Sequence, residues 1–442
     1  MENWKKSRFN ALSKTYDGQI ILYNSFTGAI GVVPDEENQT VVELLKKEKI
    51  KNEEIENKDL WDALVENGFL VPFETNEDKN AIEQRKEYFD QDKTLFLIIL
   101  PTEQCNFRCT YCYESFLKGR MKPEVIEGIK NFITSRVKSI DTLIIEWFGG
   151  EPTEALDVIY DLSKYIIDEC DRNNVKYYAR MTTNGYNLTP VVFQKLVEEC
   201  RVTAYQITVD GNKDSHDKTR ISKEGKSTYN RIMSNIENFR KHDFSFTVTI
   251  RCNFNQENAH YVNLLLNELK EKLKDDERFN INFHAVGKWG GENDEDLVVC
   301  TGREASVIQS QLYDEANQKG FNKNHTVMKN LLNPGASVCY AAKPWSLVIG
   351  SDGTLYKCTI ALYDDRNQIG KLLPNGNLEM DNDKYNLWVN VGASMDEKCG
   401  KCFYSPSCQG ASCPLKKLDS GISPCPPAKR YIKRTLTTVV GR

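Results

Sequence analysis

Between residues 94 and 287 the chain alternates short apolar segments with longer segments that carry one polar face. The apolar segments are rich in β-branched and aromatic residues and have the length of strands. The longer ones, such as EVIEGIKNFITSRV, have the period of helices. Strands that alternate with helices form parallel sheets, because a parallel pair needs a crossover connection. Six strands are predicted, at residues 94–101, 142–148, 177–184, 204–210, 246–252 and 279–287.

Glycine and small polar residues follow five of these strands. In chain order the segments are CNFRCTYC, FGGEP, TTNG, TVDG and, after the last strand, VGKWGG. In parallel sheets and barrels, chemistry collects at the carboxyl ends of the strands, where glycine lets the backbone approach a ligand closely. One such segment would be an ordinary turn. Five on the same edge of a sheet predict a binding site there.

The segments on either side depart from this alternation. ILYNSFTGAIGVV has strand and turn character, ETNEDKNAIEQRKEYFDQDK is predicted to be a helical linker, and a helix is expected at about residues 303–319. A cysteine-rich tail begins at residue 339. We therefore expect an α/β protein with an N-terminal domain and linker, an α/β domain, a bridging region and a cysteine-rich domain, at residues 1–90, 91–300, 301–338 and 339–442.

Composition and charge narrow the class of protein. A chain of 442 residues is too long to fold around one hydrophobic core of ordinary size, so more than one domain is expected. Its content of 27% charged and 40% hydrophobic residues is typical of soluble globular proteins. The net charge of −5 argues against a broad nucleic-acid surface. The apolar run LFLIIL is far shorter than a membrane span, and no apolar region of a secretory signal follows MENWKKSRFN. We expect a cytoplasmic protein with neither a nucleic-acid nor a membrane partner.

Ten of the 14 cysteines fall in two groups. Because a large cytosolic chain is kept reduced, grouped thiols favour metal binding over disulfides. The four scattered cysteines, Cys170, Cys200, Cys252 and Cys300, are expected to be inert. The grouped ones are Cys105, Cys109 and Cys112 in the first loop, and Cys339, Cys358, Cys399, Cys402, Cys408, Cys413 and Cys425 in the tail.

The three thiols of CNFRCTYC suit an iron–sulfur cluster better than zinc. Thiolates select zinc, copper(I) or iron–sulfur clusters. Structural zinc needs four ligands, and no fourth His or Cys lies nearby in the sequence. A [4Fe–4S] cluster with three cysteine ligands leaves one iron open to a substrate or cofactor.

CxxxCxxC after the first strand, with GGEP after the second, resembles the radical S-adenosylmethionine (SAM) superfamily over roughly residues 94–290. The resemblance implies a partial (β/α)6 barrel like that of TIM barrels. It also implies a cluster on Cys105, Cys109 and Cys112 whose open iron binds SAM. Reduction then cleaves SAM to a 5′-deoxyadenosyl radical that abstracts a substrate hydrogen.

The same resemblance implies which other residues surround SAM. Tyr111 is expected near the adenine, the GGE motif at the methionyl amino group, and the TVDG segment at the ribose or carboxylate. Gly287 and its neighbour are expected to line the adenine. The full set is Tyr111, Gly149, Gly150, Glu151, Thr208, Asp210, Arg220 and Val286.

The tail resembles the SPASM extension, which houses two auxiliary [4Fe–4S] clusters and would bring the total to three. Four residues separate its fifth and sixth cysteines, whereas three are usual in the family. Its CxxC motif is also compatible with a zinc ribbon. The resemblance assigns Cys339, Cys358 and Cys413 to the first auxiliary cluster. It assigns Cys399, Cys402, Cys408 and Cys425 to the second. Either Cys300 completes the first cluster or that cluster keeps an open iron, which we prefer.

An open auxiliary iron would bind a substrate thiolate. Anaerobic sulfatase maturases typically carry Asp after the second SPASM cysteine, where this chain has Thr359. HAVGKWGG and YNSFTGAI resemble thioether-forming maturases of sactipeptides and ranthipeptides. We therefore predict Cys-to-carbon cross-linking of a ribosomally made precursor peptide, with flavodoxin or ferredoxin as electron donor.

In those maturases a winged-helix-like N-terminal domain binds the precursor's leader as an added strand, and residues 1–90 are expected either to do the same or to form a structural cap. Three alternatives stay open. Two are enzymatic: carbon–carbon cross-linking and sulfatase-type maturation. The third is a zinc-stabilised peptide-binding module without activity. The sequence identifies no catalytic base.

Overall fold

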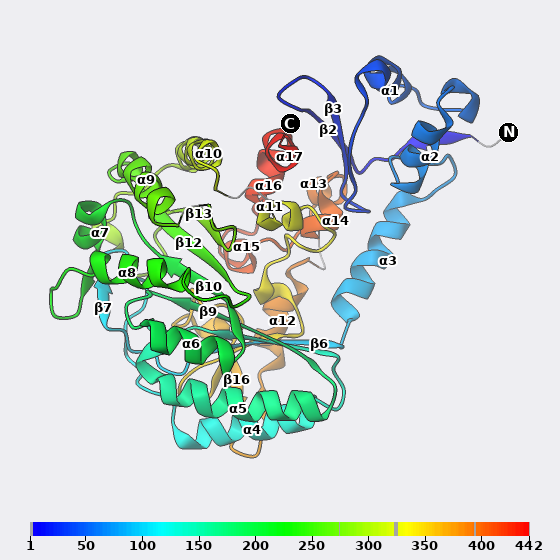
Figure 1. Ribbon diagram of the computed structural model, residues 1–442. Coiled ribbons are helices and arrows are strands. Elements are labelled where there is room, and N and C mark those ends of the chain that lie inside the picture. The colour runs from blue at the N-terminus through cyan, green and yellow to red at the C-terminus, as the bar shows by residue number, and fades with distance from the viewer. Residues whose placement is uncertain (1–2, 274, 322–325, 393–394, 442) are drawn as a thin grey trace. The chain divides into compact units, whose positions relative to one another are not determined.

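The computed structural model describes residues 3–273, 275–321, 326–392 and 395–441 (Figure 1). The chain divides into two compact units. The terminal unit consists of Met1–Gln91, Asn324–Pro344 and Asn386–Arg442, and the sheet unit of Asp92–Lys323 and Trp345–Tyr385. The four-part division drawn from the sequence stays a prediction. No helix of the described residues is long and apolar enough to cross a bilayer.

Six parallel strands form the centre of the sheet unit. They are β6 (Thr94–Ile99), β8 (Thr142–Trp147), β9 (Lys176–Thr183), β10 (Val202–Thr208), β12 (Thr247–Phe254) and β13 (Phe279–Ala285). Each is hydrogen-bonded in parallel to the next one in this order. This confirms the six predicted strands and the α/β class, with the strand order of a partial (β/α)6 barrel.

Four more strands continue the sheet beyond β6. They are β14 (Ser346–Ile349), β15 (Thr354–Tyr356), β16 (Gln368–Leu372) and β17 (Leu378–Met380). β14 is parallel to β6, and the others follow as antiparallel neighbours. The side chains of β6 from Leu95 to Ile99 are buried on both faces of the sheet, as the unbroken apolar run predicts for a parallel strand covered on both sides.

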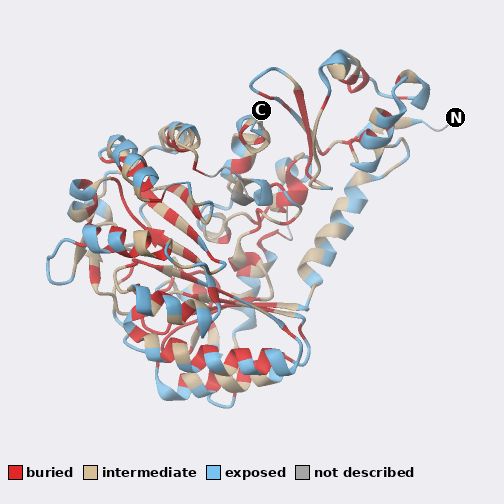
Figure 2. Cartoon of the chain, in the orientation of Figure 1, coloured by how far each residue is buried: buried red, intermediate tan, exposed pale blue. Residues whose placement is uncertain are grey.

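Helices follow the strands and bury one face each, as the pattern of red and blue along α4 and α5 illustrates (Figure 2). In α5, Val158, Ile159, Leu162 and Ile166 are buried at helical spacing. Prolines begin α4 and α6, where a missing N–H costs nothing. The bounds are α4 (Pro123–Arg136), α5 (Leu156–Arg172), α6 (Pro190–Glu198), α7 (Lys213–Thr219), α8 (Tyr229–Phe239), α9 (Val262–Leu273), α10 (Gly302–Gln318) and α12 (Asn382–Val389).

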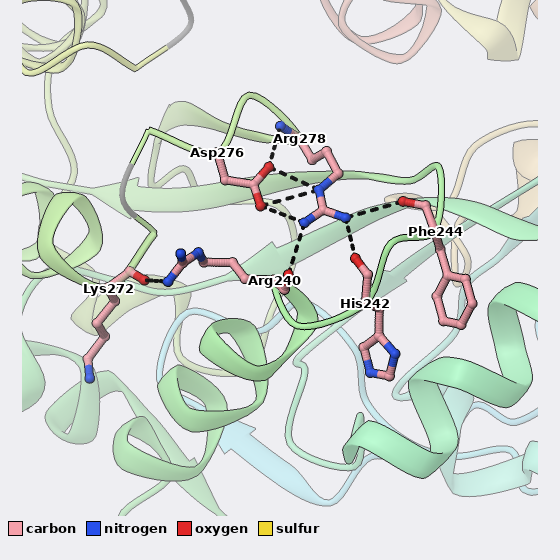
Figure 3. A network of polar contacts seen from close by, with 6 residues as sticks. All are labelled: Arg240, His242, Phe244, Lys272, Asp276 and Arg278. Carbon is pink, nitrogen blue, oxygen red and sulfur yellow. Dashed lines mark hydrogen bonds and ion pairs between the residues drawn. The ribbon is translucent and has the colours of Figure 1, made fainter.

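One arginine ties together the loops at the amino ends of β12 and β13 (Figure 3). The Arg278 guanidinium binds the Asp276 carboxylate, with Nη2 2.7 Å from Oδ2. It also donates to the backbone oxygens of His242, Phe244 and Arg240 at 2.6, 3.2 and 3.2 Å. These bonds stabilise the edge of the sheet opposite to the glycine-rich segments, and leave that other edge for chemistry.

The terminal unit joins the two ends of the chain around one hydrophobic cluster. Tyr23, on the N-terminal strand β3, donates from its hydroxyl to the Leu332 oxygen at 2.6 Å. Tyr404 and Leu436 of the tail are buried in the same cluster. The sequence pattern does not predict that the N-terminal strands pack against the tail, because contacts between distant segments leave no periodic signal.

The helix predicted in the linker is confirmed as α3, which has no buried residue. The strands of the terminal unit are β1 (Trp4–Lys6), β2 (Asn10–Lys14), β3 (Ile20–Asn24), β4 (Ile30–Val32) and β5 (Leu70–Pro72). Its helices are α1 (Asn38–Leu44), α2 (Lys58–Glu66), α3 (Glu77–Asp90), α11 (Thr326–Leu331), α13 (Glu397–Gly400), α14 (Ser405–Cys408), α15 (Pro414–Ser420), α16 (Pro427–Arg430) and α17 (Ile432–Val440).

Candidate radical site

The three-thiol loop begins at the carboxyl end of β6 and is held by a small second sheet. Its strand β7 (Phe107–Cys109) pairs antiparallel with β11 (Arg220–Ser222), with Cys109 opposite Arg220. The Thr110 N–H donates to the Thr219 oxygen at 2.9 Å, which extends this pairing. The loop is therefore fixed by a segment that lies more than a hundred residues further along the chain.

The three thiols are all half-buried. Burial raises the pKa of each of Cys105, Cys109 and Cys112, that of Cys112 to about 12. Cys109 raises the pKa of both other thiols further, so the three lie close to one another. Thiols of this kind hold protons at neutral pH until a metal displaces them.

The donor set fits a cluster. Among the described residues, no three His, Cys, Asp or Glu side chains are arranged to hold a single metal ion. In a cluster each cysteine binds a different iron, so its ligands lie farther apart than those of one ion. Three grouped thiols on one loop fit a [4Fe–4S] cluster with an open iron, and their role as its ligands stays a prediction.

Beside the thiol loop, Tyr111 and Asp210 form a buried network. The Tyr111 hydroxyl donates to Asp210 Oδ2 and accepts from Arg220 Nη1 at 2.8 Å and from Asn253 Nδ2 at 3.2 Å. The Asn253 N–H donates to Asp210 Oδ1 at 2.8 Å. Burial raises the pKa of Asp210, and the Arg220 guanidinium opposes that rise. The structure thus brings together three of the residues predicted around SAM.

Glu151 joins the ends of β8 and β9. Its Oε1 accepts from the N–H and hydroxyl of Thr153 at 3.0 and 2.6 Å and from the Thr183 hydroxyl at 2.7 Å. Its Oε2 accepts from the Asn184 N–H at 2.7 Å. Burial raises the pKa of Glu151, and these donors oppose that rise. The carboxylate also raises the pKa of Cys105, so the GGE motif lies beside the thiol loop.

The glycines of that motif are required by close backbone packing. Gly149 has φ +128°, and a Cβ there would collide with the Thr102 oxygen. A Cβ on Gly150 would collide with the Gln104 oxygen. At Gly291, after β13, a Cβ would lie 2.5 Å from the Cys112 oxygen. Two of the glycine-rich segments that follow the strands therefore lie directly against the thiol loop.

The remaining predicted SAM contacts lie at the same edge. Thr208 ends β10 and is paired in register with Arg251 of β12. The Val286 N–H donates to the Phe254 oxygen at 2.8 Å, just beyond the end of β13. The role of these residues in SAM binding stays a prediction.

In the tail, four of the seven cysteines are grouped. Burial and Asp396 raise the pKa of Cys399 to about 12, and Cys408 and Cys402 add to the rise. Burial raises the pKa of Cys408 to about 11, with Cys402 and Cys425 adding to it. These four are the residues assigned to the second auxiliary cluster.

The other three tail cysteines are divided between the units. Cys339 and Cys413 lie in the terminal unit, where the Cys339 N–H donates to the Ala411 oxygen at 3.0 Å. Cys358 lies in the sheet unit, and Tyr113 lies within electrostatic range of it. Their assignment to one cluster stays a prediction.

Several residues of the candidate site were not predicted from the sequence. Asn253 and Asn184 act through single hydrogen bonds that leave no pattern, although Asn184 stands inside the TTNG segment. Glu103 and Glu114 are also buried here. Burial, and then Glu103, raise the pKa of Glu114 to about 8. The chain has 63 acidic residues, so Glu103 and Glu114 could be distinguished from the others only once their burial was known.

Comparison with known proteins defines the class. Residues 99–269 match the Radical SAM superfamily. The chain therefore contains a radical SAM domain, which marks it as an enzyme and confirms the resemblance seen in the sequence. Such a domain implies SAM and a [4Fe–4S] cluster as cofactors.

The individual relatives extend over most of the chain. A cysteine-type anaerobic sulfatase-maturating enzyme of Clostridium novyi (strain NT) is 23% identical over 339 residues, 72% of this chain and 87% of that protein. The structure of anSMEcpe with bound AdoMet and Kp18Cys peptide has TM-score 0.61 and 21% identity, covering 79% of this chain and 98% of that one. Streptococcus suis SuiB bound to precursor peptide SuiA has TM-score 0.52 and 14% identity, covering 95% and 98%. Identities this low show a shared fold.

Proposed function

We propose that the protein is a radical SAM peptide maturase that forms Cys-to-carbon thioether cross-links in a ribosomally made precursor. The observation that carries the proposal is the second set of seven cysteines, beyond the three of the radical SAM loop. Thr359 after Cys358 supports cross-linking over sulfatase maturation, because it offers no carboxylate as a base.

The residues have separate roles in this proposal. Cys105, Cys109 and Cys112 hold the SAM-binding cluster, and the buried network of Tyr111 and Asp210 orients SAM. SAM supplies, on one-electron reduction by flavodoxin or ferredoxin, the 5′-deoxyadenosyl radical that takes a hydrogen atom from a substrate carbon. The tail cysteines hold two auxiliary clusters, for a total of three.

The proposed reaction balances in atoms and electrons. A C–H and an S–H bond of the peptide are broken, and one C–S bond forms. The carbon-bound hydrogen leaves in 5′-deoxyadenosine, since the C5′–S bond of SAM breaks with methionine as the leaving group, and the thiol hydrogen leaves as a proton. An auxiliary cluster held by the tail cysteines would supply the oxidant that accepts the remaining electron. Binding of the thiolate to an open iron would lower the pKa of the substrate thiol and hold sulfur beside the carbon.

The N-terminal sheet is the proposed leader-binding element. Its strand order is β2, β3, β4, so β4 is an edge strand among the described strands. Edge strands present unpaired N–H and C=O groups to which a peptide adds as a further strand. SuiB, which shares the fold over most of this chain, has been solved with its precursor peptide SuiA.

Sulfatase-type maturation is the second candidate. It is supported by the similarity to the Clostridium novyi enzyme and to anSMEcpe, which has been solved with a cysteine-containing peptide named Kp18Cys. Here a single peptide cysteine would be oxidised, and no cross-link would form.

Mass spectrometry separates the candidates. Reconstituted protein, SAM, reductant and a Cys-containing precursor encoded nearby should yield a peptide that has lost two hydrogens for each bridge, with the thiol closed to alkylation. An aldehyde trapped by hydrazide reagents would favour sulfatase-type maturation instead. SAM cleavage with unchanged peptide mass, or a cross-link that still forms when the substrate thiols are blocked, would contradict thioether formation.

Metal content tests the cofactor count. Three clusters predict about twelve irons per chain. A zinc-stabilised binding module predicts about one or two zincs and no 5′-deoxyadenosine. Replacing Cys399 and Cys402 together by Ala should remove about four irons and leave SAM binding intact, if these residues hold the second auxiliary cluster.

A further inference from the structure

Two buried carboxylates beside the thiol loop have no part in the roles described so far. Glu103 follows β6 and is fully buried, and Glu114, two residues after Cys112, is 9% exposed. The negative charge of Glu103 acts on Glu114, so the two side chains lie close together. We call them the acidic pair.

The acidic pair is short of hydrogen-bond donors. Glu103 Oε1 accepts from the N–H and hydroxyl of Ser351 at 3.0 and 2.9 Å. Among the residues that the structure describes, Glu103 Oε2 and both carboxyl oxygens of Glu114 have no hydrogen-bond partner. Buried carboxylate oxygens without donors are costly and rare in folded proteins. Three of them in one place indicate that a donor from outside this chain belongs there.

Two cations of the same part of the chain, Lys118 and Arg108, bind other groups. Lys118 pairs with Asp352 at 2.9 Å and donates to the Tyr356 hydroxyl at 2.5 Å. Arg108, in the thiol loop, donates to the oxygens of Cys105 and Phe107. Neither donates to Glu114, so the structure supplies no cation for that carboxylate.

Tyr363 lies near the acidic pair and is partly exposed. Its hydroxyl accepts from the Ser115 N–H at 3.3 Å. Burial raises the pKa of Tyr363, and the charges of Glu114 and Glu103 add to that rise, which places the ring near both carboxylates. Tyr363 is 40% exposed, so the group of side chains around the acidic pair reaches the surface at this ring.

We infer that the acidic pair binds an arginine or lysine side chain of the substrate peptide. An ammonium has three N–H donors and a guanidinium five, which match three unpartnered oxygens on two carboxylates. Binding a cation here would place the adjacent peptide residues next to the thiol loop, where the radical is generated. The inference rests on the proposed function in that the substrate is a peptide, and it adds a charge requirement for its sequence.

The test uses reconstituted, SAM-bound protein and two small probes: N-acetyl-arginine methylamide and its neutral isostere, N-acetyl-citrulline methylamide. Calorimetry should show the arginine probe binding at least about tenfold more tightly than the citrulline probe, because only the former carries charge. E114Q should remove most of that difference, E114D should keep part of it, and E271Q, on the exposed face of α9, should keep all of it.

Two further measurements keep the result interpretable. Without probe, E114Q should melt at about the same temperature as the wild type, because it replaces a buried carboxyl group that has no hydrogen-bond partner by an amide of the same shape. E114Q should also bind SAM as the wild type does. Equal binding of the two probes to the wild type would overturn the inference, and so would loss of SAM binding in E114Q, which would assign the acidic pair to SAM. These readouts are binding and melting, so they are separate from the peptide-mass assay of the proposed function.

Discussion

At the scale of single residues, the buried acidic side chains of this protein differ in how many hydrogen-bond donors surround them. Asp210 and Glu151 are surrounded by donors from other segments, and such saturation lets a buried carboxylate remain fixed in one position. Glu103 and Glu114 are equally buried but keep three oxygens without a donor. The first kind of acid organises the site, and the second is left for a ligand.

His216 is bound to the backbone of one of these acids, and it allows a prediction about how stability depends on pH. Its Nδ1 lies 3.2 Å from the Asp210 N–H, which donates to it, and its Nε2 lies 3.1 Å from the Thr228 hydroxyl. Burial lowers the pKa of His216 to about 3. The unfolded chain therefore binds a proton at this residue below about pH 6.5, and the folded chain does not.

Stability should fall with acidification in that window. As pH falls from 6.5 toward 3, His216 lowers the free energy of unfolding, by about 1.4 kcal/mol at pH 5.5. Denaturant unfolding of iron-free protein at pH 7.5 and 5.5 measures the loss, and H216N should show a smaller one. Asp217, whose pKa is lowered to about 2, contributes in the same direction only at lower pH. An equal loss in both proteins would contradict the prediction.

At the scale of elements, the site is built from loops that only glycine lets come together. The segment after β8 lies against the loop after β6 at Gly149 and Gly150, and the segment after β13 lies against Cys112 at Gly291. These approaches explain the glycines in FGGEP and VGKWGG independently of any contact with SAM.

G149A should therefore disrupt the site even though it adds only a methyl group. A φ of +128° is strained for alanine, and the Cβ would collide with the Thr102 oxygen. We expect a loss of about 2–4 kcal/mol in stability and weaker cluster retention. The control is G225A, which has φ +77° but open space around the Cβ, so it keeps the strain without the collision. Iron content and melting temperature measure both, and equal effects would show that strain alone is responsible.

At the scale of the whole molecule, the two ends of the chain fold as one unit. The cluster of Ile21, Tyr23, Leu332, Tyr404 and Leu436 joins the N-terminal sheet to the cysteine-rich tail. The element proposed to bind the leader and four cysteines proposed to hold a cluster therefore depend on the same core.

L436A should loosen both ends together. Removing a fully buried leucine side chain costs about 2–5 kcal/mol. Limited proteolysis should then cut within residues 1–91 as well as in the tail, while residues 92–320 stay protected. I82A, at a side chain that is 65% exposed on α3, is the matched control and should stay within about 0.5 kcal/mol of the wild type. Cleavage confined to the tail would show that the ends are independent.

By itself the sequence determined the local features of this protein. Periodicity identified the six parallel strands, because side-chain alternation and burial are encoded within a few residues of one another. The spacing CxxxCxxC drew attention to the thiol loop for the same reason, and the glycine-rich segments after the strands indicated one edge of the sheet.

Only the tertiary structure decided what meets across distance. The Tyr111–Asp210–Asn253 network, the bonds from Thr183 and Asn184 to Glu151 and the joining of the chain ends all depend on residues tens to hundreds of positions apart. A hydrogen bond or a buried charge is defined by its surroundings in space, and those surroundings exist only once the chain has folded.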